Sequence, residues 1–525
     1  MHIGTHMYTS LARALMVVVG VAATGAFAAS AADPKYRITD IGTLGGSYTE
    51  GAALNASGQV TGYSITSGNT SAHAFLWRND GTPMVDLGPF DPSGAPTDFS
   101  AGVALNAAGQ VTGHASPRGG GADYAFVWKN DGTPMKNLGT LGGKSSQGAD
   151  INDLGQVVGV ADLPGNVKHH AFLWKNNGQR IQDLGTLGGS SSAATALNGS
   201  GQVTGYADRP GDIDTHAFLW RNDGTPMKNL GTIGGHKSSG VFINSSGQVA
   251  GISNINVHNK NAYHAFLWRN DGTRMVNLGT LGGMQSRASA LNESGQIVGL
   301  STHQLSTFSG AHAYLWKNDG TPIINLGNVD PFGDQSGGLD INDAGWVVGF
   351  GTESVNFSNR AFLWRDDGLG MRDLNDLIDP ADPLKPYVVL EVALAINDAG
   401  DILARGSDTR GTGSRAYFLR GSSLALAPRV LAFANQTVGT SSTSKSVTMQ
   451  NNSSSVVPVT SIALAGSGAG QFALTHNCGS AVVGNGSCTI KVVFKPNTKG
   501  AKSATLSVNG GGGGLRVVSL AGTGI

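Results

Sequence analysis

Short segments in which apolar and polar side chains alternate recur along most of the chain. One stretch contains four of them, at 193–198, 202–206, 216–220 and 227–231, separated by clusters of Asn, Asp, Ser and Gly. Alternation with a period of two between turn residues is typical of β-strands. No segment shows the 3.6-residue spacing of an amphipathic helix, which argues against a helical repeat. The pattern therefore predicts an all-β protein.

Three short phrases recur in a fixed order, and they define a repeat. They are Asn-x-x-Gly before an apolar strand, Ala-aromatic-apolar-Trp, and Asp/Asn-Leu-Gly. Successive aromatic phrases are 51, 46, 46, 48, 48, 48 and 55 residues apart, and a period near 48 with several strands per unit is typical of a β-propeller. We predict structural roles for the repeated Asn and Trp side chains, which are Asn55, Asn106, Asn152, Asn198, Asn244, Asn292, Asn342 and Asn397, and Trp77, Trp128, Trp174, Trp220, Trp268, Trp316 and Trp364.

Each repeat is expected to form one four-stranded antiparallel blade. The first strand is built of small residues, which suits the crowded position nearest the axis, whereas the aromatic third strand suits the wider space between blades. Residues 221–224 (Arg-Asn-Asp-Gly) predict a tight hairpin between the third and fourth strands, because Asn, Asp and Gly tolerate positive φ.

The two ends of the repeat region predict how the ring closes. Residues 36–42 look like a fourth strand with no blade before them, and the last repeat, 393–420, has three strands and no clear fourth. Pairing the two would hide two exposed strand edges. We therefore predict an eight-bladed β-propeller over residues 36–421, closed by the N-terminal strand; a seven-bladed ring with one unpaired repeat is the alternative.

In these phrases the sequence resembles the HAF family of probable extracellular repeat proteins. The His-Ala-Phe triplet stands at 73–75, 170–172, 216–218 and 264–266, and the resemblance covers nearly all of 36–420. Tyr124, Arg360 and Arg415 depart from the pattern at the His position, and the last repeat is degenerate. The resemblance implies export and a repeat fold, but no particular reaction or ligand.

The composition changes after Arg420 to a Ser-, Thr- and Val-rich segment of short alternating strands. About 100 residues of this kind predict an immunoglobulin-like β-sandwich over 422–525. Phrases such as 433–439 and 520–524 resemble choice-of-anchor D modules, which are related to ASH/Hydin-like domains. Cys478 and Cys488, close together in an exported chain, predict a disulfide, which stabilises by about 2–3 kcal/mol because its loop is short.

The N-terminus predicts export. Residues 1–31 have the features of a signal peptide, with Arg13 before an apolar stretch at 14–28 and small residues for cleavage after Ala28 or Ala31. The apolar stretch is short for a membrane span, although an uncleaved anchor is an alternative; no other segment is apolar enough. Lys+Arg and Asp+Glu are balanced at 35 each, so neither a nucleic-acid nor a membrane-surface partner is expected. We expect a monomer in the periplasm, at the cell surface or in the medium.

The sequence singles out no catalytic, metal or cofactor site. The recurring histidines, His73, His170, His216, His264 and His312, would be spread around a ring, too far apart to share an ion. They alternate with Phe and Trp on one face of the third strand, so we expect them to pack against the next blade. The Asn-Asp-Gly turns lack the alternating acidic ligands of a calcium loop, and calcium there remains a minor alternative.

The connections between strands give the functional prediction. Turns one–two and three–four are short and uniform, whereas connections on the opposite face vary, at 64–72, 116–123, 253–263 and 301–311, with insertions at 89–100, 329–337 and 375–390. Variable loops on a rigid scaffold are where binding usually occurs. We therefore expect a non-catalytic binding or structural protein whose variable face and axial mouth recognise a glycan or an envelope protein. Replacing the 375–390 insertion by a short turn is then expected to reduce binding while leaving the fold intact.

The alternative is a polysaccharide hydrolase or lyase built on the propeller. It would need a cleft with several titratable groups in reach of one another. The candidates on the variable connections are Asp91, Asp98, Asp330 and Asp334.

Overall fold

The computed structural model describes residues 36–525 except 70, 89–96, 118–120, 257–261, 304–309, 412, 422–423, 429, 452–455, 467, 485 and 511–513. The signal peptide expected at 1–31 lies outside the described residues. The described residues form β-strands and two 3-10 turns, Ser67–Asn69 and Ala469–Gln471, with no α-helix among them. None of their helical segments is long and apolar enough to cross a membrane. The all-β prediction is confirmed.

The strands of the repeat region form successive four-stranded antiparallel sets, in which each strand pairs with its neighbour in sequence. The first four sets are β2 (Gly45–Leu54), β3 (Val60–Thr66), β4 (Ala72–Trp77) and β5 (Val85–Asp86); β6 (Thr97–Leu105), β7 (Val111–Pro117), β8 (Tyr124–Trp128) and β9 (Lys136–Asn137); β10 (Ser146–Ile151), β11 (Val157–Asp162), β12 (His169–Trp174) and β13 (Gln182–Asp183); β14 (Ser192–Leu197), β15 (Val203–Asp208), β16 (Thr215–Trp220) and β17 (Lys228–Gly231). A single parallel bridge, Ala72 to Phe99, links the first two sets.

The next three sets repeat the same plan. They are β18 (Ser238–Ile243), β19 (Val249–Asn254), β20 (Tyr263–Trp268) and β21 (Val276–Asn277); β22 (Ser286–Leu291), β23 (Ile297–Thr302), β24 (Ala311–Trp316) and β25 (Ile324–Gly327); β26 (Ser336–Ile341), β27 (Val347–Thr352), β28 (Asn359–Trp364) and β29 (Met371–Asp373). The uniform pairing follows from the uniform turns. In the β16–β17 turn, for example, Asn222 and Gly224 take φ values of 57° and 85°, the left-handed conformation that these two residue types tolerate best.

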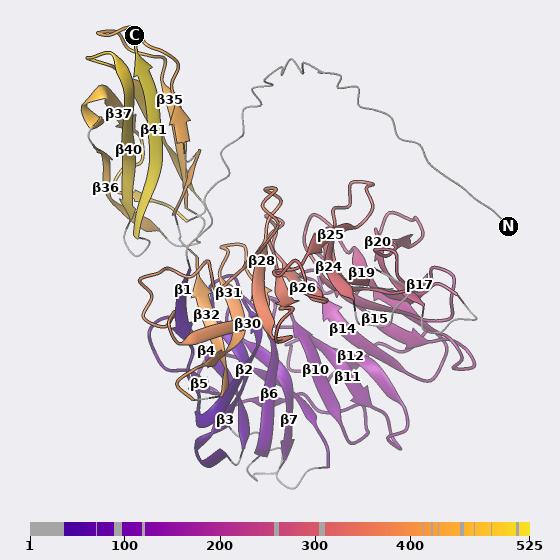
Figure 1. The fold of residues 1–525 in the computed structure, drawn as a ribbon. Helices are drawn as coiled ribbons and strands as arrows, with labels where there is room; N and C mark the ends of the chain where they lie inside the picture. Colours follow the sequence, from indigo (N-terminus) through magenta and orange to yellow (C-terminus); the bar gives the residue numbers. More distant parts are fainter. Residues whose placement is uncertain are drawn as a thin grey trace, which may run out of the picture.

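The last set combines both ends of the repeat region. It contains β30 (Val388–Ile396), β31 (Ile402–Asp408), β32 (Ser414–Arg420) and, as its fourth strand, β1 (Arg37–Asp40). β1 pairs antiparallel with β32 from Arg37–Arg420 to Asp40–Tyr417, which is the pairing predicted from residues 36–42. Figure 1 shows the indigo β1 beside the orange β32. This pairing joins the beginning of the repeat region to its end.

Apolar side chains fill the space between neighbouring sets. Phe218 and Trp220 of β16 pack with Val158 and Leu173 of the preceding set, while Leu219 faces the other way, toward the following set. The aromatic residues therefore pack against the preceding unit. The face that they share with the recurring histidines was expected to meet the next blade, and that prediction is wrong. Side chains alternate along a strand, so the two faces of each third strand serve two different interfaces.

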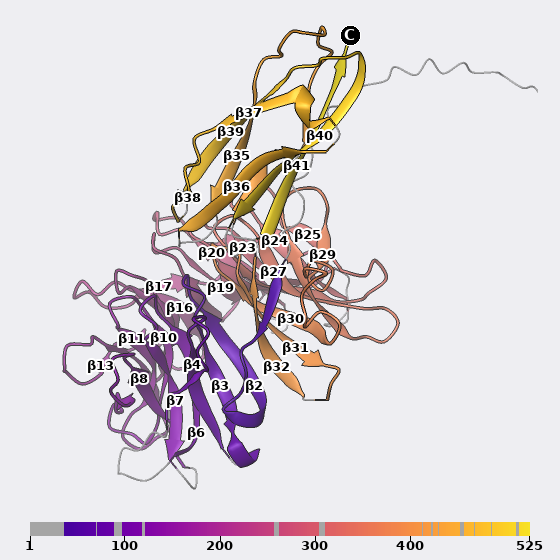
Figure 2. The same ribbon diagram turned by 90° about the vertical axis from the view of Figure 1, so that its left-hand side faces the viewer.

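The same kind of apolar packing joins the last four-stranded set to the first. Leu403 and Phe418 of the last set share a buried cluster with Val60, Phe75 and Trp77 of the first set. Figure 2 shows β2 next to β31 and β32. The sets therefore have no free end, and the repeat region has a β-propeller arrangement.

The C-terminal segment folds as two sheets around one apolar core. One sheet has the order β33 (Leu424–Ala427), β35 (Lys445–Asn451), β39 (Ser487–Phe494), β37 (Phe472–His476), and the other β34 (Val430–Ala432), β41 (Gly514–Gly524), β40 (Gly500–Gly510), β36 (Val457–Ala465), β38 (Ala481–Val482). Phe494 and Leu506, one from each sheet, are fully buried in the shared core. Cys478 and Cys488 form the predicted disulfide.

Candidate functional site

The eight repeated Asn side chains form a closed ring of hydrogen bonds. The Nδ2 atom of each Asn donates to the backbone carbonyl of the next Asn, at 3.0–3.3 Å, from Asn55 through Asn106, Asn152, Asn198, Asn244, Asn292 and Asn342 to Asn397. Asn397 then donates to the carbonyl of Asn55 at 3.1 Å. All eight are buried. The ring ties the first strand of each unit to the first strand of the next.

Each Asn also holds the turn that follows it. The Oδ1 atom of Asn198 accepts hydrogen bonds from the amides of Ser200 and Gln202, and its Nδ2 atom donates to Oε1 of Gln202 at 2.8 Å. Asn side chains often fix turns in this way. The same side chain thus shapes a turn and binds the neighbouring unit, which accounts for its recurrence without a ligand.

The repeated tryptophans lie between the units. All seven are buried, with exposed fractions of 1–7%, and Trp174 is among the largest fully buried side chains. Trp220 shares a buried cluster with Val158 and Leu173 of the preceding unit, and Trp77 lies against Phe418 of the last unit, with ring centroids 5.2 Å apart. Large aromatic side chains at these positions supply the volume that the interfaces need.

The recurring histidines bind the fourth strand of their own unit. His73 Nδ1 lies 3.0 Å from Asp86 and His170 Nδ1 lies 2.8 Å from Asp183, and the equivalent partner of His216 is Asn229. Burial lowers the pKa of His216. No group of three His, Cys, Asp or Glu side chains among the described residues could hold a metal ion. The partner residue is the Asp or Asn of the Asp/Asn-Leu-Gly phrase, so the two phrases recur together because their side chains meet.

The sequence analysis missed a repeated hydroxyl that also joins the units. Ser238 Oγ accepts from the amide of Ala217 in the preceding unit and donates to the carbonyl of Gly231. The same pair of contacts recurs at Ser146, Ser192, Ser286 and Ser336. A signal was present, because Ser or Thr stands six positions before seven of the eight Asn residues.

The Asn-Asp-Gly turns, considered as calcium sites, are satisfied internally. Asp223 Oδ1 accepts from the amide and the hydroxyl of Thr225 at 2.9 and 2.5 Å. These bonds hold the pKa of Asp223 below its usual value. The same Asp–Thr contacts recur in the turns at Asp80, Asp131, Asp271 and Asp319. This face of the repeat region is therefore occupied by short turns bonded to themselves.

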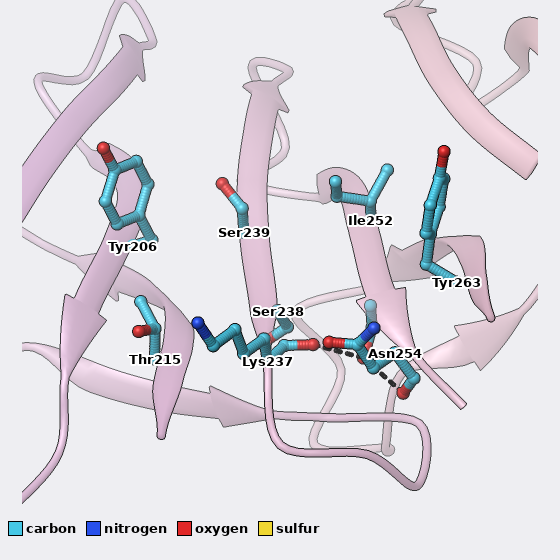
Figure 3. Close-up of a pocket in the computed structure, with 9 residues that line it drawn as sticks. Tyr206, Thr215, Lys237, Ser238, Ser239, Ile252, Asn254 and Tyr263 are labelled. Carbon is cyan, nitrogen blue, oxygen red and sulfur yellow. Dashed lines mark hydrogen bonds between the residues drawn. The ribbon is translucent and has the colours of Figure 1, made fainter. Parts of the chain in front are cut away.

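The opposite face carries the variable connections, and pockets lie at the strand ends there. The first pocket has a volume of about 360 Å³ and lies between β15–β16 and β18–β20. Tyr206 and Tyr263 stand on opposite sides of it, with Ser239 and Ile252 between them (Figure 3). Lys237 completes the lining together with Thr215, Ser238, Ser253 and Asn254. The walls are mostly carbon surface and the charged group is a single cation.

Tyr263 is held in place from behind. Its hydroxyl accepts a hydrogen bond from Arg287 Nε at 2.9 Å and donates to Gln285 Oε1 at 2.8 Å. The guanidinium carbon of Arg287 lies 4.8 Å from the centre of the Tyr263 ring, a cation–π contact. These contacts hold the Tyr263 side chain on its side of the pocket.

The second pocket, of about 390 Å³, contains charges of both signs. Asp330, Glu353, Arg360 and Asp373 line it together with Val329, Pro331 and Val355. Glu353 pairs with Arg360 at 2.6 Å. The Ser354 hydroxyl lowers the pKa of Asp330, whereas burial raises the pKa of Asp373. The pKa values of the Asp330 and Asp373 carboxyls are thus shifted in opposite directions.

The four carboxylates that the sequence singled out do not come together in one site. Asp330 lines the second pocket, while Asp334 is exposed and does not line it. Asp91 and the side chain of Asp98 lie outside the described residues. Asp373, at the end of β29, was not among the candidates, because it belongs to a fourth strand and not to a variable connection.

The 375–390 insertion packs against the N-terminal strand, so its replacement by a short turn would remove buried contacts, a cost that the sequence-based prediction of an intact fold did not include. Leu377 and Ile378 are buried in the same cluster as Tyr36 and Ile38. The amide of Ile38 donates to Asp382 Oδ2 at 2.9 Å. The insertion therefore covers the N-terminal strand, a role that required knowing where residues 36–40 lie in space.

Two half-buried acidic residues, Asp150 and Asp340, occupy equivalent bulged positions in the first strands of two units. Asp150 Oδ2 accepts from the amide of Leu197, and Asp340 Oδ2 from that of Ile396, each in the following unit. Burial raises the pKa of each to about 6, from an ordinary value of 3.8. Such a group binds its proton more tightly in the folded state, so its stabilisation is greatest below pH 3.8 and is lost as the pH rises through about 6.

We expect the double substitution D150N/D340N to reduce the dependence of the free energy of unfolding on pH. Because an amide cannot ionise, the free energy of unfolding of the variant should rise relative to that of the wild type between pH 4 and pH 7. Urea titrations at several pH values measure this difference. The exposed Asp334→Asn serves as the control, and parallel profiles for wild type and double variant would contradict the expectation.

Comparison with known proteins identifies no family. No protein-family model and no curated protein matches the chain. Among solved structures, the β-propeller domain of the Trilobed protease from Pyrococcus furiosus has 10% identity and a TM-score of 0.40, covering 67% of this chain and all of that one. TolB from Acinetobacter baumannii has 13% identity and a TM-score of 0.32, covering 62% and 83% of the two chains.

The C-terminal segment has a structural match of its own. An ASH / PapD-like domain of human CEP192 has 12% identity and a TM-score of 0.16, covering 20% of this chain and 86% of that one. All three TM-scores lie below 0.5. The sheet order and the ring of Asn hydrogen bonds in this chain therefore support the propeller arrangement.

Proposed function

We propose that this chain is an exported, non-catalytic binding protein of the HAF repeat type, in which the variable face of an eight-bladed β-propeller recognises a glycan or an envelope protein. The propeller spans 36–421 and an immunoglobulin-like, choice-of-anchor D type sandwich spans 422–525. The eight four-stranded sets and the ring of eight Asn residues support the blade number. The apolar stretch within 1–31 supports export.

The observation that carries the proposal is the contrast between the two faces. Both pockets lie among the variable connections, whereas the short turns of the other face bind their own side chains. The five most exposed large hydrophobic side chains described in the repeat region also lie on that face, at 71–91% exposure, on connections between second and third or fourth and first strands: Val167, Ile213, Phe332, Val355 and Phe357. Exposed apolar side chains gathered on one face are a usual feature of recognition surfaces.

Blocking one face at a time tests this proposal. Ser239→Arg places a long side chain in the first pocket, and Gly199→Arg places the same side chain on the opposite face. Gly199 is a suitable control because a Cβ there would meet nothing within 4 Å. Both variants and the wild type are applied to arrays of bacterial and plant polysaccharides and of envelope proteins.

We expect S239R to lose at least tenfold in affinity for the captured ligand and G199R to bind as the wild type does. Equal binding by S239R and G199R, or no binding by the wild type to any array member, would overturn the proposal. Thermal unfolding of the three proteins verifies that the folds are equally stable.

A polysaccharide hydrolase or lyase is the second candidate, and one feature of the second pocket favours it. Asp373 has a raised pKa and Asp330 a lowered one, and carboxyls with pKa values pushed apart are typical of acid–base pairs. Release of reducing ends from the same polysaccharides, abolished by Asp373→Asn, would support this alternative. Absence of activity in the wild type would leave binding as the function.

A further inference from the structure

We propose that the pocket between Tyr206 and Tyr263 binds a saccharide carrying an anionic group, a carboxylate or a sulfate, with Lys237 as the partner of that group. The inference rests on the proposed function, because it names the class of ligand for the same face. Three features of the pocket support this ligand: the tyrosine walls, the hydroxyl of Tyr206 and the charge of Lys237.

The walls suit a sugar ring. Tyr206, from β15, and Tyr263, from β20, face the pocket from neighbouring units with Ser239 and Ile252 between them (Figure 3). Tyrosine offers a flat apolar face with a polar tip and loses little conformational entropy on binding. A pyranose ring has apolar C–H faces and polar edges, so it matches this arrangement. The volume of about 360 Å³ accommodates roughly one or two such rings.

The two walls differ in how they are held. The hydroxyl of Tyr263 is bonded to Arg287 and Gln285, which fixes that wall. The hydroxyl of Tyr206 has no hydrogen-bond partner among the residues that the structure describes, so it is available to a ligand. A polar atom at the edge of an otherwise apolar pocket orients a ligand and gives specificity.

The charge of the pocket selects an anion. Lys237 is exposed, its ammonium group has no ion-pair partner in the described part of the chain, and no carboxylate lines the pocket. The neighbouring acidic groups are engaged elsewhere: Asp214 pairs with His236 at 2.7 Å, and Asp208 accepts from Thr215 at 2.8 Å. An unpaired ammonium beside carbon surface favours a carboxylate or sulfate that it can bind without competition.

The backbone around Lys237 keeps it at the pocket. Its carbonyl accepts hydrogen bonds from the amide of Asn254 at 2.8 Å and from the hydroxyl of Ser253 at 3.2 Å. A parallel bridge joins Lys237 to Thr215 on the other side. These contacts hold the backbone of Lys237 between the two units, so its flexible side chain stays near the pocket.

Calorimetric titration of the full chain tests the inference with three probes: a galacturonic acid trimer, a galactose trimer of the same size without charge, and a sulfated galactose trimer. We expect at least one charged trimer to bind at least tenfold more tightly than the neutral one, and the comparison of the two identifies the anion. Raising the salt concentration should weaken the binding of the charged trimer and leave the affinity for the neutral trimer unchanged.

Two variants assign the binding to this pocket. Lys237→Gln should reduce the affinity for the charged trimer about tenfold without affecting the neutral one, while Tyr206→Ala should weaken both. Lys168→Gln is the matched control, because Lys168 is an exposed lysine on a variable connection outside the pocket. It should bind as the wild type does.

Three outcomes would overturn the inference: equal affinity for charged and neutral trimers, unchanged binding in K237Q, or Lys237-dependent binding of a glutamate-rich peptide with no binding of any trimer. Each is distinguishable from failure of the proposed function. If S239R still loses an array ligand while the trimers do not bind, the variable face recognises a ligand of another class. If S239R and G199R behave alike, the face itself is the wrong surface.

Discussion

Removing residues 1–41 is expected to destroy the cooperative unfolding of the repeat region. The truncation deletes β1 and leaves β32 as an open edge. It also removes the buried side chains of Tyr36, Ile38 and Ile41, whose burial contributes about 5–9 kcal/mol in total. This loss is comparable with the whole net stability of a typical domain. The covering segment around Leu377 would lose its partner as well.

Tryptophan fluorescence during thermal unfolding measures this effect selectively. All eight tryptophans lie between residues 77 and 364, so the signal reports on the repeat region and not on the C-terminal sandwich. A shorter truncation, of residues 1–34, keeps Tyr36 and β1 and should unfold like the untruncated chain. Equal transition temperatures for the two truncations would contradict closure of the ring by β1.

The substitution Asn198→Ala is expected to reduce the free energy of unfolding by about 2–4 kcal/mol. It removes four hydrogen bonds, two donated by Nδ2 and two accepted by Oδ1. It also leaves the half-buried amide of Gln202 without this partner, whereas the carbonyl of Asn244 keeps the hydrogen bond from the amide of Gly247 at 2.9 Å. An amide left without a partner costs more than the average value of a hydrogen bond.

Urea titration followed by tryptophan fluorescence measures this loss. The neighbouring Ser200→Ala is the control, because Ser200 is exposed and takes part only through its backbone amide. It should change the stability by less than about 0.5 kcal/mol. A similar small effect for N198A would mean that the ring of Asn residues does not stabilise the fold.

The two faces of the repeat region explain why the same short phrases recur while the connections differ. Asn, Ser, Phe and Trp at the repeated positions bind or pack against the next or preceding unit, so a change at one position disturbs two units. The pocket-lining positions outside the repeated phrases carry no such constraint, and each can take a different side chain. Tyr206 of β15 and Ile252 of β19, for example, occupy equivalent strand positions in neighbouring units and together line the first pocket.

Much of the fold could be predicted from the sequence because its information is local. Alternation defined the strands, and the Asn-Asp-Gly turns defined the hairpins. The lone fourth strand at 36–42 indicated where the series closes. The cysteine pair was recognisable from its spacing. These features act within one repeat or between obvious partners, where side-chain periodicity and turn chemistry determine the backbone.

The functional surface needed the tertiary structure, because its residues come from different units. Tyr206 and Tyr263 are far apart in sequence, and neither belongs to a motif. The contacts of the 375–390 insertion were missed for the same reason, since its partners include Tyr36 and Ile38 at the other end of the chain. The sequence alone thus determined the repeating unit and its order. Only the packing of units decided which side chains meet, because contacts between distant strands depend on the geometry of the closed ring and not on local pattern.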